Sequence, residues 1–367
     1  MNSPQLNIAV LCGGQSSEHE ISLISAHNIV EVLLKNPRYE ISVIYITQEG
    51  EWSKINSAKD FLNGNWKNKT QLIALTPGQS KRPWKIVNQG HDERVDVVFP
   101  VLHGTKGEDG AMQGLLEILN IPYVGASVLS SAMCMNKIIT KKILRASDID
   151  LADWLVVTEE NLPKIKTQEI IDELGLPLFV KPASQGSSVG VMKVKKVDEL
   201  IPAIKNALKY DPEILLEEAI IGQEIECSVL GNENPKASMP GEVVPHDEFY
   251  SYRAKYLDKN GADLLIPARL LESTARQVQE IAVKAYKLLN VFGMARVDFF
   301  VTNTHDIYLN ELNAIPGFTQ ISMYPKMWEA SGLSYADLLD ELIRLAIARF
   351  EKEKKLVHAY EQAKSEK

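Results

Sequence analysis

The chain has 367 residues, of which 45% are hydrophobic and 24% charged, as in a water-soluble globular protein with two or three domains. Its net charge of −8, without a basic stripe, argues against a nucleic-acid partner. No apolar run approaches the ~20 residues of a membrane helix, and the first residues lack a secretion-signal pattern. With three cysteines and no metal-ligand spacing, we expect a cytoplasmic protein with no membrane partner.

The first third of the chain alternates between apolar runs and helical patterns. The apolar runs predict four buried strands, at 7–11, 41–46, 95–102 and 121–124. Helices are expected to follow Gly13-Gly14 and to cover 111–119, so this region predicts a mainly parallel α/β sheet. Residues 50–94 are polar and irregular, and they predict no clear element.

Two polar side chains, Glu18 and His103, follow the ends of predicted strands. We place both near a cleft, because ligands bind at the carboxyl ends of the strands in such sheets. Compensation of a helix dipole is the alternative role for Glu18. A structural role is the alternative for His103.

From Ser130 the pattern changes. A basic amphipathic helix is expected at 135–146, with Lys137 near its start. Lys181 ends the buried strand 178–182, and because lysine is rarely buried without a partner, we expect a phosphate beside it. The segment 183–191 is rich in glycine and serine, so its N–H groups and hydroxyls suit an anion. An ordinary hairpin loop is the alternative for this segment.

The segment 249–256 is expected to be a loop. It gathers aromatic and basic side chains, namely Tyr250, Tyr252, Arg253, Lys255 and Tyr256. The alternative to a functional role is an exposed loop that packs its own aromatic rings. A helix capped by Ser273 follows, and a last amphipathic helix is expected at 335–349.

Residues 294–319 predict a β-hairpin, with strands at 295–301 and 307–313 and a four-residue turn at 303–306. This register places Asp298 opposite Glu311, with Asn313 on the same face as Glu311. Two facing carboxylates repel unless a cation or a proton lies between them. Two acids and an amide oxygen therefore predict a Mg²⁺ site that also holds phosphates. A solvated hairpin with scattered charge is the alternative.

Seven motifs in chain order carry a resemblance to a known family. They are EHEIS at 18–22, LHG at 102–104, VKPASQGSSVGV at 180–191, EEAIIGQEIECSVLG at 217–231, YSYRAKY at 250–256, RVDFF at 296–300 and NELNAIPGFT at 310–319. In this order the motifs resemble those of D-alanine–D-alanine ligases, which are ATP-grasp enzymes. Each motif alone is modest support, but the seven together span nearly the whole chain.

The resemblance implies an α/β protein in which an N-terminal parallel, Rossmann-like domain precedes a two-subdomain ATP-grasp fold. We expect an N-terminal substrate domain at 1–128, a central subdomain at 129–219 and a C-terminal subdomain at 220–367 with the metal site and a lid loop. It also implies a reaction in which ATP converts one D-alanine into D-alanyl phosphate. The amine of a second D-alanine attacks this intermediate and forms the dipeptide for peptidoglycan synthesis.

The resemblance further implies roles for individual residues. The metal ligands would be Asp298, Glu311 and Asn313, which hold two Mg²⁺ ions, with Mn²⁺ as a substitute. The nucleotide would be bound by Lys137, Lys181, Gly186, Ser187, Ser188, Glu217, Glu224 and Lys255. Catalytic roles would belong to Glu18, Ser187, Tyr256, Arg296 and Gly317. The D-alanine substrates would be bound by Glu18, His103, Arg296 and Ser322.

Three other functions remain open at this point. One is a ligase that joins D-alanine to D-lactate, although ester-forming members usually lack a tyrosine at the position of Tyr256. The second is another ATP-dependent carboxylate–amine ligase of the same fold, although Glu18, Ser187 and Tyr256 together argue against it. The third is an ATP-binding regulatory module without catalysis, although every expected catalytic position is filled. The chain departs from some members at Glu218, where they carry lysine. A homodimer is the family expectation.

Overall fold

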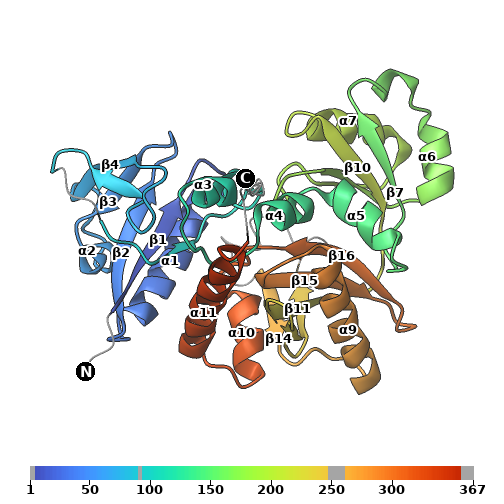
Figure 1. The fold of residues 1–367 in the computed structure, drawn as a ribbon. Helices are drawn as coiled ribbons and strands as arrows, with labels where there is room; N and C mark the ends of the chain where they lie inside the picture. Colours follow the sequence, from blue (N-terminus) through green and yellow to red (C-terminus); the bar gives the residue numbers. More distant parts are fainter. Residues whose placement is uncertain (1–4, 90–92, 247–260, 357–367) are drawn as a thin grey trace, which may run out of the picture.

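The computed structural model describes residues 5–89, 93–246 and 261–356. Three β-sheets follow one another along the chain, each with helices beside it (Figure 1). The first and third sheets lie on either side of helix α11, and the second sheet stands above the third in that view.

The first sheet has the strand order β5-β4-β3-β2-β1-β6. Its strands are β1 (Leu6–Gly13), β2 (Tyr39–Ile46), β3 (Trp52–Ile55), β4 (Thr70–Leu75), β5 (Trp84–Ile86) and β6 (Val97–Pro100). Its helices are α1 (His19–Leu33), α2 (Ala58–Leu62) and α3 (Ala111–Ile118). Strand β1 pairs in parallel with β2 and β6, and its apolar residues are buried, as predicted.

The prediction of a mainly parallel sheet is too simple for this region. Residues 50–94, for which no element was predicted, add β3, β4 and β5 to the sheet in antiparallel pairing. Buried Trp84 packs in this extension, so scattered aromatics were the signal that the segment folds. The strand expected at 121–124 is a single bridge between Val98 and Tyr123.

The second sheet is antiparallel, in the order β7-β10-β8-β9. Its strands are β7 (Trp154–Thr158), β8 (Leu178–Pro182), β9 (Met192–Val194) and β10 (Glu213–Glu218). The helices of this region are α4 (Val128–Met135), α5 (Lys137–Arg145), the 3-10 helix η1 (Leu162–Lys164), α6 (Thr167–Leu174) and α7 (Val197–Ala207).

The helix expected at 135–146 begins two residues later than predicted. Asn136 adopts an extended conformation between α4 and α5, and its side-chain oxygen accepts a hydrogen bond from the Ile139 N–H at 3.0 Å. Asparagine is a favoured N-cap residue, so the chain ends one helix and starts another at this position. The cap places Lys137 at the first position of α5, close to the loop that follows β8.

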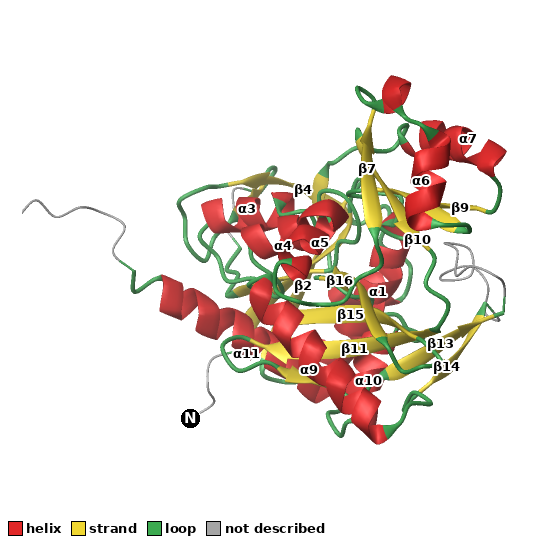
Figure 2. Cartoon of the chain, turned by 90° about the vertical axis from the view of Figure 1, so that its right-hand side faces the viewer, coloured by secondary structure: helices red, strands yellow, loops and turns green. Residues whose placement is uncertain are grey.

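The third sheet is also antiparallel, in the order β14-β13-β11-β15-β16, with β12 paired to β11. Its strands are β11 (Gln223–Gly231), β12 (Lys236–Ala237), β13 (Gly241–Pro245), β14 (Ala262–Leu265), β15 (Gly293–Val301) and β16 (Ile307–Asn313). Its helices are α9 (Glu272–Leu288), α10 (Met323–Ala330) and α11 (Tyr335–Glu353). Figure 2 shows α9 and α10 beside the strands of this sheet.

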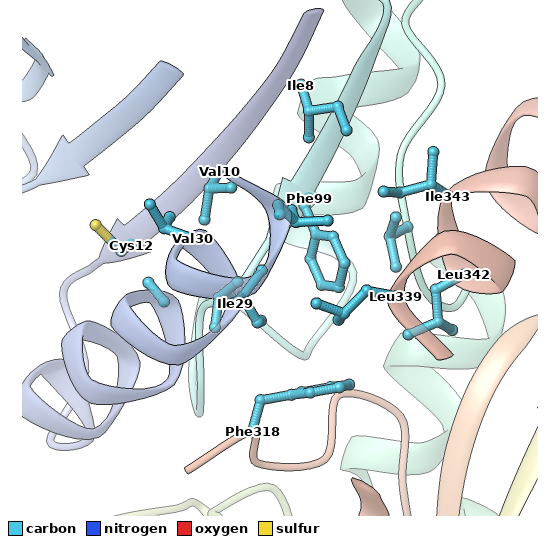
Figure 3. Packing of buried hydrophobic residues seen from close by; sticks show 14 of the residues in the cluster. Ile8, Val10, Cys12, Ile29, Val30, Phe99, Phe318, Leu339, Leu342 and Ile343 are labelled. Carbon is cyan, nitrogen blue, oxygen red and sulfur yellow. The ribbon is translucent and has the colours of Figure 1, made fainter. Parts of the chain in front are cut away.

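Helix α11 joins the first sheet to the third. Figure 3 shows Leu339 and Ile343 of α11 packed near Phe99 of β6, with Phe318 from the segment after β16 beside them. The buried guanidinium of Arg349 donates hydrogen bonds to the carbonyl oxygens of Gly125 at 2.6 Å and Tyr123 at 3.2 Å. The second sheet instead has a hydrophobic cluster of its own.

None of the helices within the described residues combines the length and apolar character needed to cross a membrane.

Candidate active site

A cavity of about 480 Å³ lies where segments of all three sheets meet. It is lined by every predicted site residue that the structure describes, namely Glu18, His103, Lys137, Lys181, Gly186, Ser187, Ser188, Glu217, Glu224, Arg296, Asp298, Glu311, Asn313, Gly317 and Ser322. Lys255 and Tyr256 lie outside the described residues. The sequence motifs therefore come together in one place, although up to about 300 residues separate them along the chain.

The hairpin β15–β16 forms one wall, and it places Asp298 opposite Glu311 as predicted. The turn is longer than predicted, because Val301 pairs with Ile307 and five residues form the turn instead of four. That pairing alone would set Asp298 opposite Asn310. A β-bulge at this point shifts the register by one residue and brings Glu311 into place.

The sequence of β16 carries the signal of this bulge. Its buried apolar side chains are Ile307, Leu309 and Leu312, so the spacing changes from two to three between the last two. A side chain changes face when one extra residue enters a strand. The bulge therefore turns Glu311 and Asn313 toward the cavity, while Leu312 stays in the core.

Arg296 is held between two carboxylates of this wall. Its guanidinium donates to Asp298 at 2.7 and 2.6 Å, and its Nε lies 3.0 Å from Glu226 Oε2 on the neighbouring strand β11. Asp298 also accepts a hydrogen bond of 2.9 Å from the amide nitrogen of Asn313. Two-point pairing with a carboxylate fixes both the position and the plane of an arginine side chain. Glu226 was not among the predicted site residues.

Glu18 forms another wall of the cavity and is buried. It is the N-cap residue of α1 but makes no side-chain cap hydrogen bond. Its Oε1 instead accepts a hydrogen bond from the Ser187 hydroxyl. Two glycines leave room for this carboxylate, because a Cβ on Gly104 would lie 2.7 Å from Glu18 Oε2 and one on Gly186 would lie 3.1 Å from it.

The loop between β8 and β9 has an uncommon backbone. Ser187 and Ser188 have φ values of 49° and 60°, which non-glycine residues rarely adopt. Lys137 donates a 2.7 Å hydrogen bond to the carbonyl of Gln185 in this loop, and its Nζ lies 3.7 Å from Glu311 Oε2. One lysine therefore connects the serine loop with the hairpin wall.

His103 is buried and contacts Glu108, a partner that sequence reasoning missed. Its Nδ1 lies 3.5 Å from Glu108, and its Nε2 lies 3.2 Å from the Ser25 hydroxyl. Burial lowers the pKa of His103, but the hydrogen bond to Glu108 and the negative charges of Glu108 and Glu18 outweigh it and raise the pKa overall. Burial also raises the pKa of Glu108. The signal for Glu108 was its place in a glycine-rich loop after a strand end.

Glu217 lines the cavity and lies between two lysines. It forms ion pairs with Lys181 of β8 and with Lys141 of α5, a residue with no predicted role. Burial raises the pKa of Glu217, but the two ammonium groups more than reverse this and lower it to about 2. Lys141 lies one helical turn after Lys137, so the shared helix face was its sequence signal.

Ser322 and Gly317 also line the cavity. The hydroxyl of Ser322 accepts a 3.0 Å hydrogen bond from the N–H of Thr319, which folds the segment after β16 into a turn. A Cβ on Gly317 would lie 2.7 Å from this hydroxyl. The turn therefore depends on a glycine at that position.

Two family profiles match the chain in sequence. The profile described as the D-ala D-ala ligase N-terminus matches residues 7–126, and the one described as the C-terminus matches residues 143–344. The chain belongs to the D-alanine–D-alanine ligase family. The resemblance drawn from the seven motifs is thereby confirmed, and the family is one of ATP-dependent ligases with the ATP-grasp fold.

Individual members of the D-alanine–D-alanine ligase family are similar over nearly the whole chain. A D-alanine–D-alanine ligase of Coxiella burnetii (strain Dugway 5J108-111) is 49% identical over 364 residues, which is 97% of this chain and 98% of the relative. The solved D-alanine–D-alanine ligase from Coxiella burnetii has a TM-score of 0.85 at 45% identity, covering 96% of this chain and 97% of that one.

A second similar solved structure is named as a ligase of D-alanine and D-serine. The VanG D-Ala:D-Ser ligase from Enterococcus faecalis has a TM-score of 0.84 at 37% identity and covers 93% of this chain and 99% of that one.

Lys137 and Lys141 lie between the two ranges that the family profiles match. The placement of Lys137 at the cavity and of Lys141 against Glu217 thus comes from the structure.

Proposed function

We propose that this chain joins two D-alanine molecules into D-alanyl-D-alanine at the expense of ATP, for peptidoglycan synthesis. The observation that carries the proposal is that two differently built walls line one cavity. One wall holds the buried carboxylate of Glu18, which suits a substrate ammonium, and the other holds Arg296 among carboxylates. Such a cavity separates the recognition of an amino acid from the handling of phosphate charge.

The metal ions would be held by Asp298, Glu311 and Asn313. This donor set fits a hard divalent cation such as Mg²⁺, with Mn²⁺ as a substitute, because it supplies two carboxylates and an amide oxygen. The facing positions of Asp298 and Glu311 across the hairpin support the assignment, since two carboxylates at such a distance favour a shared cation. Two bound ions would neutralise the charge of the β- and γ-phosphates.

The nucleotide would lie along the second sheet. Lys137 and Lys181 carry the positive charge for the phosphates, and the backbone around Gly186, Ser187 and Ser188 would cover them. Glu217 and Glu224 would meet the adenine amine and the ribose hydroxyls. All of these residues line the cavity, which supports their assignment to one ligand. Lys255, which lies outside the described residues, remains a predicted partner of the γ-phosphate.

Glu18 would bind the ammonium group of the first D-alanine, with His103 nearby and Ser187 orienting the Glu18 carboxylate. The carboxylate of this D-alanine receives the γ-phosphoryl group, and the resulting acyl phosphate then has a good leaving group. Arg296 and the N–H of Gly317 would stabilise the oxyanion that forms when the amine of the second D-alanine attacks. Loss of one such donor typically costs about 2.7–4 kcal/mol of barrier.

The second D-alanine would place its carboxylate beside Ser322. An acyl phosphate hydrolyses in water, so the site must close before phosphate transfer. The segment 249–256 with Tyr256 remains the predicted lid, and it lies outside the described residues. If Tyr256 closes the site, Tyr256→Phe will lower dipeptide synthesis without lowering the melting temperature. Unchanged synthesis would remove Tyr256 from the lid.

The division of the chain, its assembly and its location are also proposals. The three sheets fall within 1–128, 129–219 and 220–367, which supports these ranges as the N-terminal, central and C-terminal parts. We propose a homodimer in the cytoplasm. Sedimentation at micromolar concentration showing a monomer would contradict the dimer, and recovery in a membrane or secreted fraction would contradict the location.

The test of the function is ADP release with ATP and Mg²⁺, with the products identified by mass. The arms contain D-alanine alone, L-alanine alone, D-alanine with D-lactate, and D-alanine with D-serine. We expect ADP and the dipeptide with D-alanine alone and neither with L-alanine. ADP release only in a mixed arm would assign the ester or D-serine product instead. Nucleotide binding without ADP release in any arm would favour a regulatory module.

A further inference from the structure

Lys141 is a charged side chain in the interior of the protein, and the proposed reaction gives it no task. It lies on α5 and is 2% exposed. Its Nζ forms an ion pair with Glu217, lies 3.4 Å from the carbonyl oxygen of Ala152 and stands 5.3 Å from the ring centre of Trp154. Lysine is among the side chains that are most rarely buried to this extent, so the contact with Glu217 is what makes its burial tolerable.

Glu217 has two lysine partners, and they differ in access to the cavity. The side chain of Lys141 is 2% exposed and Lys141 does not line the cavity, whereas Lys181 is 14% exposed and lines it. Lys181 can therefore turn from Glu217 toward a ligand, while the acidic partner of Lys141 among the described residues is Glu217. A buried carboxylate that loses its single counter-ion is strongly disfavoured, but one that keeps a second counter-ion is not.

We propose that Lys141 is a positioning residue for the nucleotide: it stays paired with Glu217 and thereby releases Lys181 to bind a phosphate group. The inference rests on the proposed nucleotide site and deepens it. Without Lys141, Lys181 would be the only cation beside a buried carboxylate, and a phosphate would have to compete with Glu217 for it. Lys141 thus acts on phosphate binding through two other residues, without touching the ligand.

A purely structural role makes a different prediction. If Lys141 only joined α5 to β10, its loss would loosen the whole pocket and weaken every ligand that enters it. The proposed role concerns the phosphates alone, so it changes the ratio of the affinities for ADP and for adenosine. This ratio separates the two roles, because the two ligands share the base and the ribose and differ only in the phosphates.

The test uses the full chain and the variants Lys141→Met and Lys142→Met. Met keeps the length of the side chain and removes the charge. Lys142 is the neighbouring lysine on the exposed side of the same helix, so Lys142→Met is the matched control. The dissociation constant of ADP is measured by calorimetry and that of adenosine by ligand-observed NMR, both with Mg²⁺.

We expect Lys141→Met to weaken ADP binding by about tenfold or more and adenosine binding by less than about threefold. Lys142→Met should change neither. Unchanged ADP binding in Lys141→Met overturns the inference, and so does an equal loss for both ligands. If the unchanged chain binds no ADP, the proposed function itself fails. These outcomes are distinguishable because the unchanged chain is measured first.

A second variant keeps the test decisive if Lys141→Met does not fold. The double variant Lys141→Met with Glu217→Gln removes both members of the buried pair and leaves Lys181 without a carboxylate partner at this position. We expect its ratio of ADP to adenosine affinity to return to the ratio of the unchanged chain, even if adenosine itself binds less tightly. A ratio that stays as low as in Lys141→Met, or that falls below the unchanged chain when only the double variant folds, contradicts the inference.

Discussion

The two walls of the cavity are built in different ways. The hairpin wall is local: Asp298 and Glu311 are 13 positions apart and are joined by the backbone pairing of β15 with β16. The other wall is distant: the hydrogen bond between Ser187 and Glu18 spans 169 positions and connects the first sheet region to the second. The hairpin wall therefore exists whenever the third sheet is folded. The Glu18 wall also depends on how the sheets are held together.

The largest effect is expected from a change in the local wall. Glu311→Gln removes one of two facing carboxylates, so the hairpin stays folded but loses charge for the proposed metal ions. We expect a fall in kcat of about 10²-fold or more in a coupled assay of ADP release. The melting temperature should be unchanged or higher, since the repulsion between the carboxylates is relieved.

The matched control for this change is Asp306→Asn. Asp306 is an exposed carboxylate in the turn of the same hairpin, where it accepts hydrogen bonds from Thr302 and Thr304. This variant should keep the activity of the unchanged chain. Full turnover of Glu311→Gln would show that the facing carboxylates are not the metal site.

A smaller effect is expected from the distant wall. Ser187→Ala removes the hydroxyl that donates to Glu18, and a hydrogen bond to a charged group is worth about 1.5–3 kcal/mol. We therefore expect kcat/KM for D-alanine to fall by about 10–100-fold in steady-state kinetics, with the melting temperature unchanged. The backbone of this wall would stay in place, but the Glu18 carboxylate would lose the hydrogen bond that orients it.

The control for this prediction is Ser184→Ala, in the same loop. Ser184 accepts a 3.2 Å hydrogen bond from Asn136 and does not line the cavity. Its loss should change kcat/KM by less than about threefold. If Ser187→Ala is as active as Ser184→Ala, the contact with Glu18 has no role in the reaction.

The same contrast explains what could be predicted from the sequence. Alternation and turn chemistry were enough to place Asp298 opposite Glu311, and only the five-residue turn with its compensating bulge was missed. No alternating pattern links the residues of the distant wall, Glu18 and Ser187, and they were found through the family motifs. Glu108, Lys141 and Glu226 were missed because their sequence signals are weak and their roles come from tertiary neighbours. The antiparallel strands within 50–94 were missed because they are short, with three to six residues each, and lie within a polar stretch of sequence.

Glu226 tests whether the local wall needs support from the next strand. Glu226→Gln leaves Arg296 paired with Asp298 but removes the carboxylate on its other side. We expect a fall in kcat of about tenfold, because the guanidinium becomes less precisely oriented, while KM for ATP stays within about twofold. A rise in KM for ATP without loss of kcat would assign Glu226 to nucleotide binding instead.

The last prediction concerns stability and not activity, and it compares the two walls with the buried ion pairs of Glu217. The pKa of Glu217 is lowered from its ordinary value of 4.5 to about 2 by Lys141 and Lys181, against the effect of burial. A carboxyl group whose pKa is lower in the folded state stabilises the fold above its ordinary pKa, and this contribution is lost as the pH falls through the folded value. By this linkage the contribution is roughly 3 kcal/mol near neutral pH.

Urea unfolding of the unchanged chain and of Glu217→Gln at several pH values measures this contribution. Glutamine resembles the protonated carboxyl group, so the difference in unfolding free energy between the two proteins should be largest near pH 6. It should shrink as the pH falls from about 4.5 toward 2, because the unchanged chain then acquires the same neutral group. Glu213→Gln, at the exposed start of the same strand, is the matched removal of one carboxylate from β10. A difference that stays constant over this range would mean that the lysines hold Glu217 through packing and geometry, and that its charge contributes little to the fold.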